Sequence, residues 1–165
     1  MFEKCKQLEY IDLSSFKINY KINMNNMFQG CQKLYENFFE RVDFKQLQNL
    51  DLSFNKIPNI EELENVNFKQ LQQLDLSFNK ISDINVLKRV DFKQLKQLYL
   101  GDNQITDIKI LEKVDFKQLQ LLNLCHNEIS DIIILEKVNF KQLQNLNINN
   151  NKISDIDVLE KVNFK

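Results

Sequence analysis

The sequence of 165 residues contains no tryptophan, one proline, two glycines and three cysteines. Gly30 and Gly101 are too few and too far apart to form a glycine-rich loop that cradles phosphate. Cys5, Cys31 and Cys125 are an odd set without a Cys-x-x-Cys spacing, so the sequence indicates neither a disulfide framework nor a zinc site. We therefore expect a chain that carries no cofactor and no metal ion.

A dominant charge and a long apolar run are also absent. The 22 basic and 23 acidic residues give a formal net charge of −1, which does not indicate a nucleic-acid-binding protein. No apolar run approaches the roughly 18–20 residues that span a bilayer. The basic residues near Met1 are not followed by an apolar stretch, so no secretory signal is indicated. We expect no nucleic-acid partner, no membrane insertion and a cytoplasmic location.

What the sequence does contain is a repeat with a period of 24 residues. The motif Phe-Lys-Gln-Leu recurs at this spacing, and its copies begin at Phe44, Phe68, Phe92, Phe116, Phe140 and Phe164. The last copy contains only Phe164 and Lys165. A fixed period of this length indicates a solenoid in which each unit contacts only its neighbours. We number positions within units 47–70, 71–94, 95–118, 119–142 and a truncated 143–165.

Each unit combines two different hydrophobic patterns. Positions 1, 4 and 6 are aliphatic, as in Leu71, Leu74 and Leu76, and the alternation predicts a short strand with one buried face. In the second half, Val86, Leu87 and Val90 have helical spacing, which predicts a short helix or 3₁₀ turn capped by Ser82 or Asp83. The repeated phenylalanines should then stack as an aromatic spine in the core.

Position 9 is asparagine in every unit. An exposed turn would accept serine, aspartate or glycine at some units, and none occurs. An asparagine among aliphatic positions must satisfy both its carbonyl and its amide, and stacked coils provide backbone partners for both. The sequence therefore predicts a buried asparagine ladder, formed by Asn55, Asn79, Asn103, Asn127 and Asn151.

The pattern LxxLxLxxNxI resembles the signature of leucine-rich repeats. The run from Asn79 to Ile84, followed by Leu87, is similar to the phosphatase-regulator and internalin-like subtype. This resemblance implies an α/β solenoid, a horseshoe or arc with a concave parallel β-sheet and short helices or 3₁₀ turns on the convex side. The family mostly binds proteins, so the resemblance implies a non-enzymatic protein–protein interaction scaffold.

Residues 1–46 do not follow the 24-residue register but contain a second repeat of their own. Met1-Phe2-Glu3-Lys4-Cys5 returns as Met27-Phe28-Gln29-Gly30-Cys31, and the pattern resembles BspA-like leucine-rich repeats, common in bacterial and protist surface proteins. Residues 34–41 fit neither template and form a junction. Cys5 and Cys31 would occupy equivalent places as two small core residues or as a disulfide. We interpret 1–165 as a single leucine-rich-repeat domain, with divergent repeats at 1–46 and five 24-residue units at 47–165.

Both ends of the sequence cut through a repeat, and neither shows a polar capping unit. We therefore expect a fragment of a longer protein and self-association through the uncapped ends. The N-terminal resemblance leaves a second interpretation open, a surface adhesin or host-contact fragment of a larger secreted or membrane-anchored protein. The absence of an Asn-x-Ser/Thr acceptor disfavours a glycosylated ectodomain.

Comparison of the units separates scaffold from surface. Positions expected to point out of the concave sheet vary most, and they give these candidate partner-binding residues: Asp51, Phe54, Asp75, Phe78, Tyr99, Asp102, Asn123, His126, Asn147 and Asn150. Among them Phe54, Phe78 and Tyr99 are interpreted as a contact anchor, because large exposed apolar side chains favour interfaces. The alternative is that Phe54 and Phe78 simply pack on each other.

An enzyme is the least favoured class. Cys125 and His126 are the only nucleophile and base side by side, but neighbours on a strand point to opposite faces. No third group is placed to orient the imidazole. We therefore expect no catalytic residues.

Overall fold

The computed structural model describes residues 21–23 and 44–162. Several sequence predictions concern residues outside these ranges. They are the N-terminal repeat that begins at Met1 and Met27, the pair Cys5 and Cys31, the junction at 34–41, and Phe164. The assignment of 1–165 to one domain stays a prediction.

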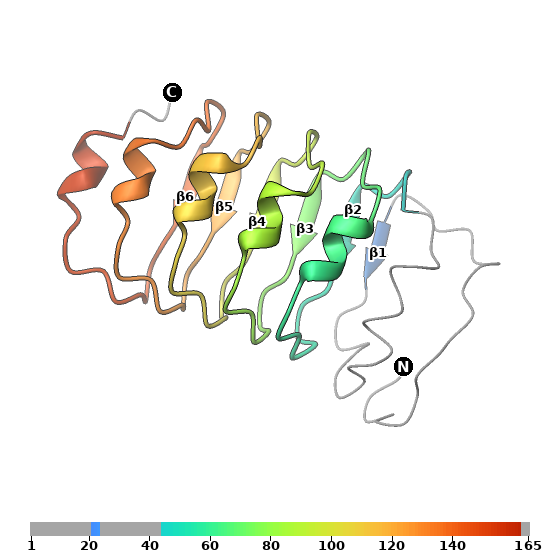
Figure 1. Cartoon of the computed structure of the whole chain (residues 1–165), viewed down its shortest axis with the longest axis horizontal. Coiled ribbons are helices and arrows are strands. Elements are labelled where there is room, and N and C mark those ends of the chain that lie inside the picture. The colour runs from blue at the N-terminus through green and yellow to red at the C-terminus, as the bar shows by residue number, and fades with distance from the viewer. Residues whose placement is uncertain (1–20, 24–43, 163–165) are drawn as a thin grey trace.

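Six short parallel strands form one sheet in the order of the sequence (Figure 1). They are β1 Lys21–Asn23, β2 Asn49–Asp51, β3 Gln73–Asp75, β4 Gln97–Tyr99, β5 Leu121–Asn123 and β6 Asn145–Asn147. From β2 to β6 the register advances one 24-residue unit per strand, so that Leu50 pairs with Leu74 and Leu74 with Leu98. β1 pairs with β2 in the same parallel sense, and sequence reasoning did not predict it.

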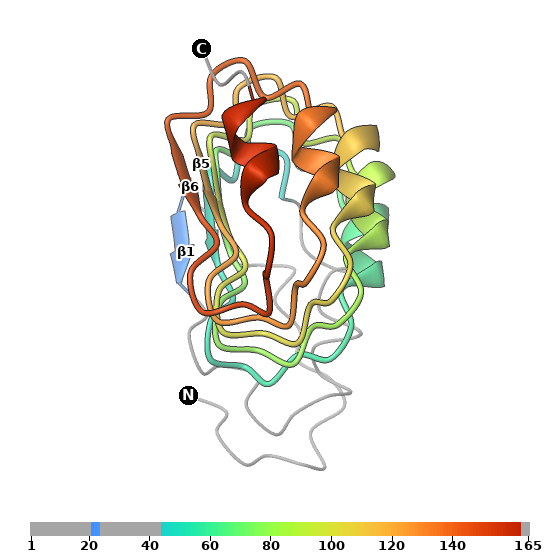
Figure 2. The ribbon, with the colours of Figure 1, turned by 90° about the vertical axis from the view of Figure 1, so that its left-hand side faces the viewer.

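Each of the five 24-residue units carries a 3₁₀ helix of four or five residues. Figure 2 shows these helices on the side of the coils opposite the sheet. These helices are η1 Glu61–Asn65, η2 Asn85–Lys88, η3 Lys109–Lys113, η4 Ile133–Glu136 and η5 Asp157–Glu160. The sequence left a short helix or a 3₁₀ turn open, and the structure selects the 3₁₀ form. The result is the predicted leucine-rich-repeat solenoid, with a concave parallel sheet and a convex helical side.

Of the two residues expected to cap η2, Asp83 bonds the first helical N–H, although it is not the residue directly before the helix. The residue before η2 is Ile84, whose side chain makes no capping hydrogen bond. Asp83, one residue earlier, accepts a 2.7 Å bond from the backbone N–H of Asn85 through its carboxylate. The same arrangement precedes η1, η3, η4 and η5, with Asn59, Asp107, Asp131 and Asp155 as acceptors. An acidic or amide side chain thus satisfies a donor that a helix start leaves free.

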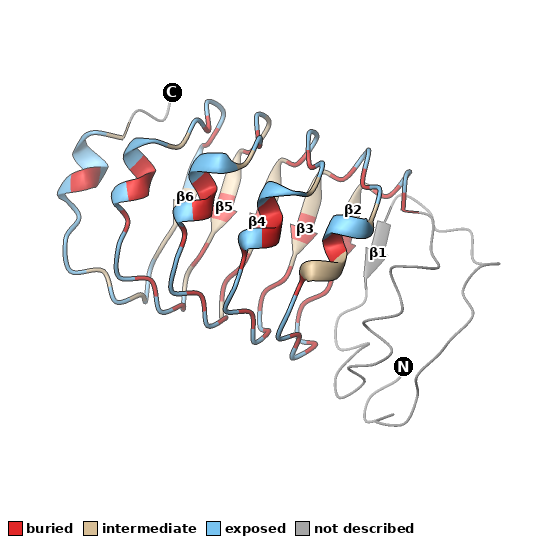
Figure 3. Cartoon of the chain, in the orientation of Figure 1, coloured by how far each residue is buried: buried red, intermediate tan, exposed pale blue. Residues whose placement is uncertain are grey.

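The core lies between the sheet and the helices, as the red segments in Figure 3 show. Its aliphatic part comes from positions 1, 4, 6, 11 and 14, which are buried in units 47–70 to 119–142. The predicted phenylalanine spine is present over Phe44–Phe140, with neighbouring ring centroids 5.5 to 6.4 Å apart and exposures of 4 % or less. Separations of this size are typical of favourable aromatic pairs.

The asparagine of position 9 ties each coil to the one before it. The Asn79 carbonyl oxygen accepts the backbone N–H groups of Asn55 and Ile57, at 3.1 and 2.9 Å. Its amide donates to the carbonyls of Leu52 and Leu76, at 3.0 and 2.9 Å. Equivalent bonds recur at Asn103, Asn127 and Asn151. This is the ladder that the repeated asparagine predicts, buried at Asn79, Asn103 and Asn127 and half-buried at Asn151.

Candidate functional site

The outward face of the sheet is built from alternate strand residues. Each strand from β2 to β5 has its central leucine buried and its first and third residues half-buried. The third residues form a row in direct register across five strands, in the order Asp51, Asp75, Tyr99, Asn123 and Asn147. Since neighbouring strands lie about 4.8 Å apart, these five predicted residues form one continuous surface.

Sequence reasoning missed the parallel row at position 3. Its members face the same way as position 5 and lie in the same register, in the order Asn49, Gln73, Gln97, Leu121 and Asn145. The Asn49 amide donates a 3.2 Å bond to the side-chain carbonyl of Gln73, which orders the first pair of this row. The burial of position 4 between them was the available signal, because residues on either side of an inward residue both point outward.

The two rows enclose a shallow hollow of about 330 Å³ over β4, β5 and β6. Tyr99, Asn123 and Asn147 line it from the predicted row, and Leu121 and Asn145 line it from the missed row. The two rows therefore contribute a phenol, one aliphatic side chain and three amides, and Leu122 and Leu146 also line the hollow. Such a surface can accept a side chain or a stretch of backbone from a partner, since amides donate and accept hydrogen bonds.

Phe54, Phe78, Asp102, His126 and Asn150 do not lie on the strands. Each strand ends at position 5, and position 8 lies in the turn that follows, with a left-handed backbone at φ values of 51 to 59°. Asn, Asp and His are the residues most often found in this conformation apart from glycine, whereas a bulky side chain there is an outlier. The expectation that position 8 projects from the strand was therefore wrong.

The rings of Phe54 and Phe78 stack face to face, with centroids 4.1 Å apart and planes inclined by 8°. They nevertheless remain 41 % and 46 % exposed. The contact between the rings is thus the one that the alternative interpretation supposed, and it leaves both rings open to solvent. Tyr99 occupies position 5 rather than position 8, so it lies in the sheet, between Asp75 and Asn123.

The first half of the row is acidic and partly desolvated. Burial raises the pKa of Asp75, although hydrogen bonds from Ser77 oppose the shift, and the neighbouring charge of Asp51 adds to it. Burial, together with the charge of Asp75, also raises the pKa of the Tyr99 phenol. Each aspartate accepts a backbone N–H two residues on, at 3.0 Å for Asp51 and 2.9 Å for Asp75. These bonds hold the carboxylates in place at the foot of the turn.

In the turns that follow β5 and β6, position 8 carries the polar residues His126 and Asn150. The Asn150 amide lies 2.9 Å from Nε2 of His126. Cys125 is half-buried, and both it and His126 follow β5 rather than belonging to it. The argument that the two point to opposite faces of a strand therefore does not apply, and the neighbour of the imidazole is an amide on the next coil.

Within residues 21–23 and 44–162, no group of three His, Cys, Asp or Glu side chains could hold a metal ion. In the same part of the chain no helix has the length and hydropathy to cross a membrane.

Comparisons with known proteins agree with this geometry. The model of the family described as "Leucine Rich repeats (2 copies)" matches residues 45–89, 69–113, 93–132 and 117–161. No curated protein sequence matches this chain significantly. Among solved structures, an internalin (inlF) from Listeria monocytogenes is similar, with 26 % identity, a TM-score of 0.61 and coverage of 85 % of this chain. An internalin C2 (inlC2) from the same organism has 25 % identity, a TM-score of 0.66 and coverage of 92 % of this chain.

A third similar structure is the plant peptide hormone receptor RGFR1 in complex with RGF2, with 19 % identity, a TM-score of 0.56 and coverage of 81 % of this chain. At that identity the likeness concerns the fold alone. The chain spans 42 % and 61 % of the lengths of the two internalins and 23 % of the receptor chain.

Proposed function

Because this chain belongs to the family of leucine-rich repeat proteins, we propose that it binds a protein partner through the concave face of its sheet and catalyses no reaction. Proteins with this fold generally serve as protein–protein interaction scaffolds and are typically not enzymes. An extended concave surface suits this role because each coil adds a strand to one continuous face. The face and the turn beside it supply the contact residues.

The observation that carries the proposal is the conformation of Phe54 and Phe78. Left-handed backbone costs an L-residue about 1–2 kcal/mol, and asparagine at the same position, as in Asn150, tolerates it better. Stacking of the two rings recovers about 0.5–1.5 kcal/mol, while both side chains remain exposed. Folding alone therefore gains little from phenylalanine at these positions. Strained, exposed aromatic residues are typical of contact sites.

The partner would meet two chemically different areas on this face. The stacked rings offer an apolar anchor at the turn, and Asp51 and Asp75 lie in the same two coils. Further along, Tyr99 and the amides around the 330 Å³ hollow offer hydrogen bonds. An apolar side chain seated on the rings, with polar backbone across the amides, fits this arrangement.

The experiment is an affinity capture from source-cell lysate with the immobilised chain and a triple variant, Phe54→Asn, Phe78→Asn and Tyr99→Asn. Each change places the residue that the chain itself uses at the equivalent position, in Asn150 and Asn147, so the fold should be kept. Glu160→Lys serves as the control, because it lies on the convex side and Lys88 occupies the equivalent position.

A protein retained by the unchanged chain and by Glu160→Lys, and lost from the triple variant, is the expected result. Equal retention by the triple variant would contradict a concave site. The free energy of unfolding of the triple variant should stay within about 1 kcal/mol of the unchanged chain, because lost stacking and relieved strain nearly cancel.

The interpretation as a surface adhesin or host-contact fragment rests on the N-terminal pattern, which lies outside the described residues. It predicts a secretion signal or a membrane anchor elsewhere in the gene. The cytoplasmic location likewise stays a prediction, and fractionation of source cells would test both.

A further inference from the structure

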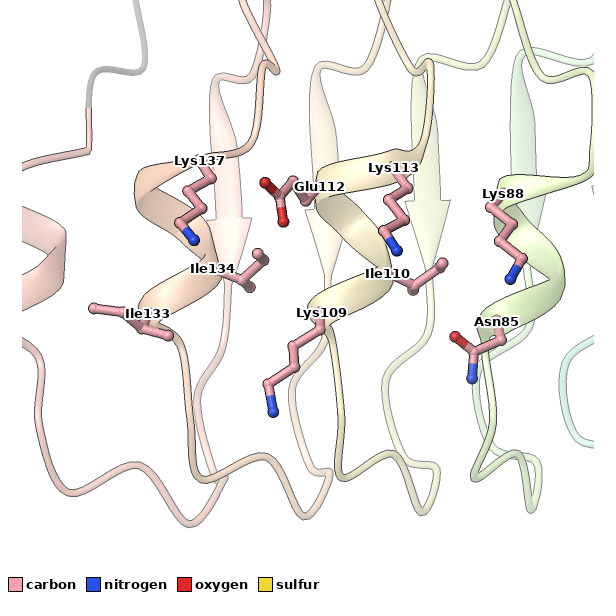
Figure 4. Close-up of a pocket in the computed structure, with 9 residues that line it drawn as sticks. All are labelled: Asn85, Lys88, Lys109, Ile110, Glu112, Lys113, Ile133, Ile134 and Lys137. Atoms are coloured by element: carbon pink, nitrogen blue, oxygen red, sulfur yellow. The ribbon is translucent and has the colours of Figure 1, made fainter.

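The convex helical side carries an uneven distribution of charge. Its first helix, η1, holds Glu61, Glu62 and Glu64, and Arg89 forms ion pairs with the first and last of these. Its last helix, η5, holds Asp157 and Glu160. The three helices between them surround a groove of about 370 Å³ with four lysines and one glutamate, namely Lys88, Lys109, Lys113, Lys137 and Glu112. Figure 4 shows these side chains on η2, on η3 and, for Lys137, directly after η4.

The four groove lysines differ from the lysines of this chain that form ion pairs. Lys93 and Lys117 each lie 3.3 Å from an aspartate, Lys152 lies 2.8 Å from Glu128, and Lys161 lies 3.5 Å from Glu136. Within residues 21–23 and 44–162, no carboxylate lies within ion-pair distance of a groove lysine. The row of lysines in the Phe-Lys-Gln-Leu motif is thus neutralised in part by its aspartates, whereas the groove keeps its positive charge.

The floor of the groove is apolar. Ile110 and Ile134 line it with exposures of 7 % and 5 %, and Ile133 stands at its edge with half of its surface exposed. Position 15, which Ile133 occupies, is polar in every other unit, in the order Glu61, Asn85, Lys109 and Asp157. An exposed isoleucine where the other coils place a polar residue is not required by the core.

A second departure from the repeat faces the same groove. Lys88 occupies position 18, where the other units have Glu64, Glu112, Glu136 and Glu160. The two residues that break the pattern of their positions, Lys88 and Ile133, therefore both line one hollow, from η2 and η4. One contributes a positive charge and the other an aliphatic contact. Together they indicate a ligand with the complementary pair of properties.

We propose that the groove is a second docking surface, which binds an acidic peptide segment bearing an aliphatic side chain. The carboxylates of the segment would meet the lysine rim, and its aliphatic group would cover Ile133 above the floor of Ile110 and Ile134. Electrostatic complementarity of this kind speeds association and selects the partner, and the apolar contact slows dissociation. This surface is distinct from the concave face, because the groove lies on the other side of the coils.

The charges beside the groove favour a short peptide over an extended anionic surface. A bilayer or a nucleic acid laid along the helices would also cover η1 and η5, whose carboxylates would repel it. A segment that crosses only η2, η3 and η4 avoids these helices. The groove is also a hollow between helices rather than a flat apolar face, which suits a side chain.

The test is fluorescence anisotropy with a labelled synthetic peptide rich in glutamate and carrying leucine. Two further peptides replace its leucines by serine or its glutamates by lysine. The groove variant combines Lys88→Glu with Ile133→Asn, which are residues found at these positions in other units. Lys80→Glu is the matched control, because it makes the same change of charge in an exposed turn, where Glu128 is the equivalent residue.

The unchanged chain should bind the acidic leucine peptide in a salt-dependent manner and the other two peptides more weakly. The groove variant should lose at least about tenfold in affinity, and Lys80→Glu less than about twofold. Lys109→Asn, a milder change to the residue of Asn85, should weaken binding several-fold even if the double variant fails to fold.

Three results of the peptide experiment would overturn the proposal. They are no binding of the acidic leucine peptide, equal binding of its serine counterpart, or an equal loss with Lys80→Glu, which would indicate unspecific attraction. Vesicles containing phosphatidylserine provide the last comparison. Groove-dependent binding to them that exceeds binding to the peptide would replace the peptide with a membrane surface.

Discussion

The side-chain amide of Asn103 joins two coils at a place where water is excluded. Its carbonyl oxygen accepts the N–H of Ile81 at 3.0 Å, and its amide donates to Leu76 of the preceding coil and to Leu100 of its own. Asn103→Leu would leave the Ile81 donor without a partner. It would also remove one of the two ladder bonds at each carbonyl, because Leu76 still accepts from Asn79 and Leu100 from Asn127. Because an unsatisfied buried group costs about 1–3 kcal/mol, we expect a loss of about 2–4 kcal/mol in the free energy of unfolding, measured by urea titration.

The control for this prediction is the neighbouring residue. Asp102→Asn keeps a side chain that tolerates the left-handed backbone and has its equivalent in Asn150, so its effect should stay within about 0.5 kcal/mol. If the two variants unfolded at the same urea concentration, the ladder would not be the interaction that links the coils.

Asp75 provides a prediction about pH. Burial raises its pKa above the ordinary value of about 3.9. The folded state therefore binds more protons than the unfolded state, and the contribution of this group to stability falls as pH rises from about 4 through the raised pKa. Asp75→Asn keeps an oxygen that can accept the Ser77 N–H and removes the charge. The variant should gain stability over the unchanged chain at about pH 7 and gain nothing at about pH 3, as urea unfolding at both values would show. A difference that does not change with pH would mean that the carboxylate is not desolvated.

At the scale of single residues, the sequence predicts what repeats and misses what depends on backbone angles. The ladder asparagines and the spine phenylalanines were predicted because every unit carries them. The left-handed turn at Phe54 and Phe78 was not predicted, because phenylalanine disfavours that conformation and its neighbours at the same position vary. The aspartate and asparagine at position 8 of other units were the available signal, since both are enriched there.

At the scale of elements, the first N–H of each 3₁₀ helix is bonded by the side chain two residues before it. Asp107 accepts the Lys109 N–H at 2.8 Å, and no capping bond comes from Ile108. Asp107→Ala removes this acceptor, so the free energy of unfolding should fall by about 1 kcal/mol, the usual cost of losing such a bond. Thr106→Ala is the control, because Thr106 is an exposed neighbour in the same turn. Equal values for both variants would show that water satisfies the donor as well as the carboxylate does.

The type of these elements could not be decided from the sequence. Four residues cover little more than one turn, so apolar spacing does not distinguish an α-helix from a 3₁₀ helix. The strands were easier to predict, because Leu50 and Leu52, like their equivalents in other units, are two residues apart and both buried. Their length of three residues was not evident, since positions 6 and 7 continue the pattern without belonging to a strand.

At the scale of the whole molecule, coils stacked in one dimension leave the last described coil exposed. Ile156 and Leu159 are 62 % and 36 % exposed, whereas Ile132 and Leu135, their equivalents one unit earlier, are 2 % and 1 % exposed. The period of 24 residues predicts such a face, because each coil is covered by the next. We expect an isolated polypeptide of residues 1–165 to associate with a second copy through this face, since burying apolar area gains about 25 cal/mol per Å².

Sedimentation equilibrium over a range of protein concentrations measures this association. Replacing Ile156 and Leu159 by lysine should shift the chain toward the monomer, because an exposed charged face cannot be buried without cost. Asp157→Lys is the control for a change of charge on the same coil, since Asp157 is exposed and outside the apolar pair. A chain that remains monomeric at high concentration, or that associates equally after the double change, would show that the last coil does not form the contact. The turns after β2 and β3 would then be the next surface to test, with the Phe54→Asn and Phe78→Asn variants, because these two exposed aromatic side chains stack there.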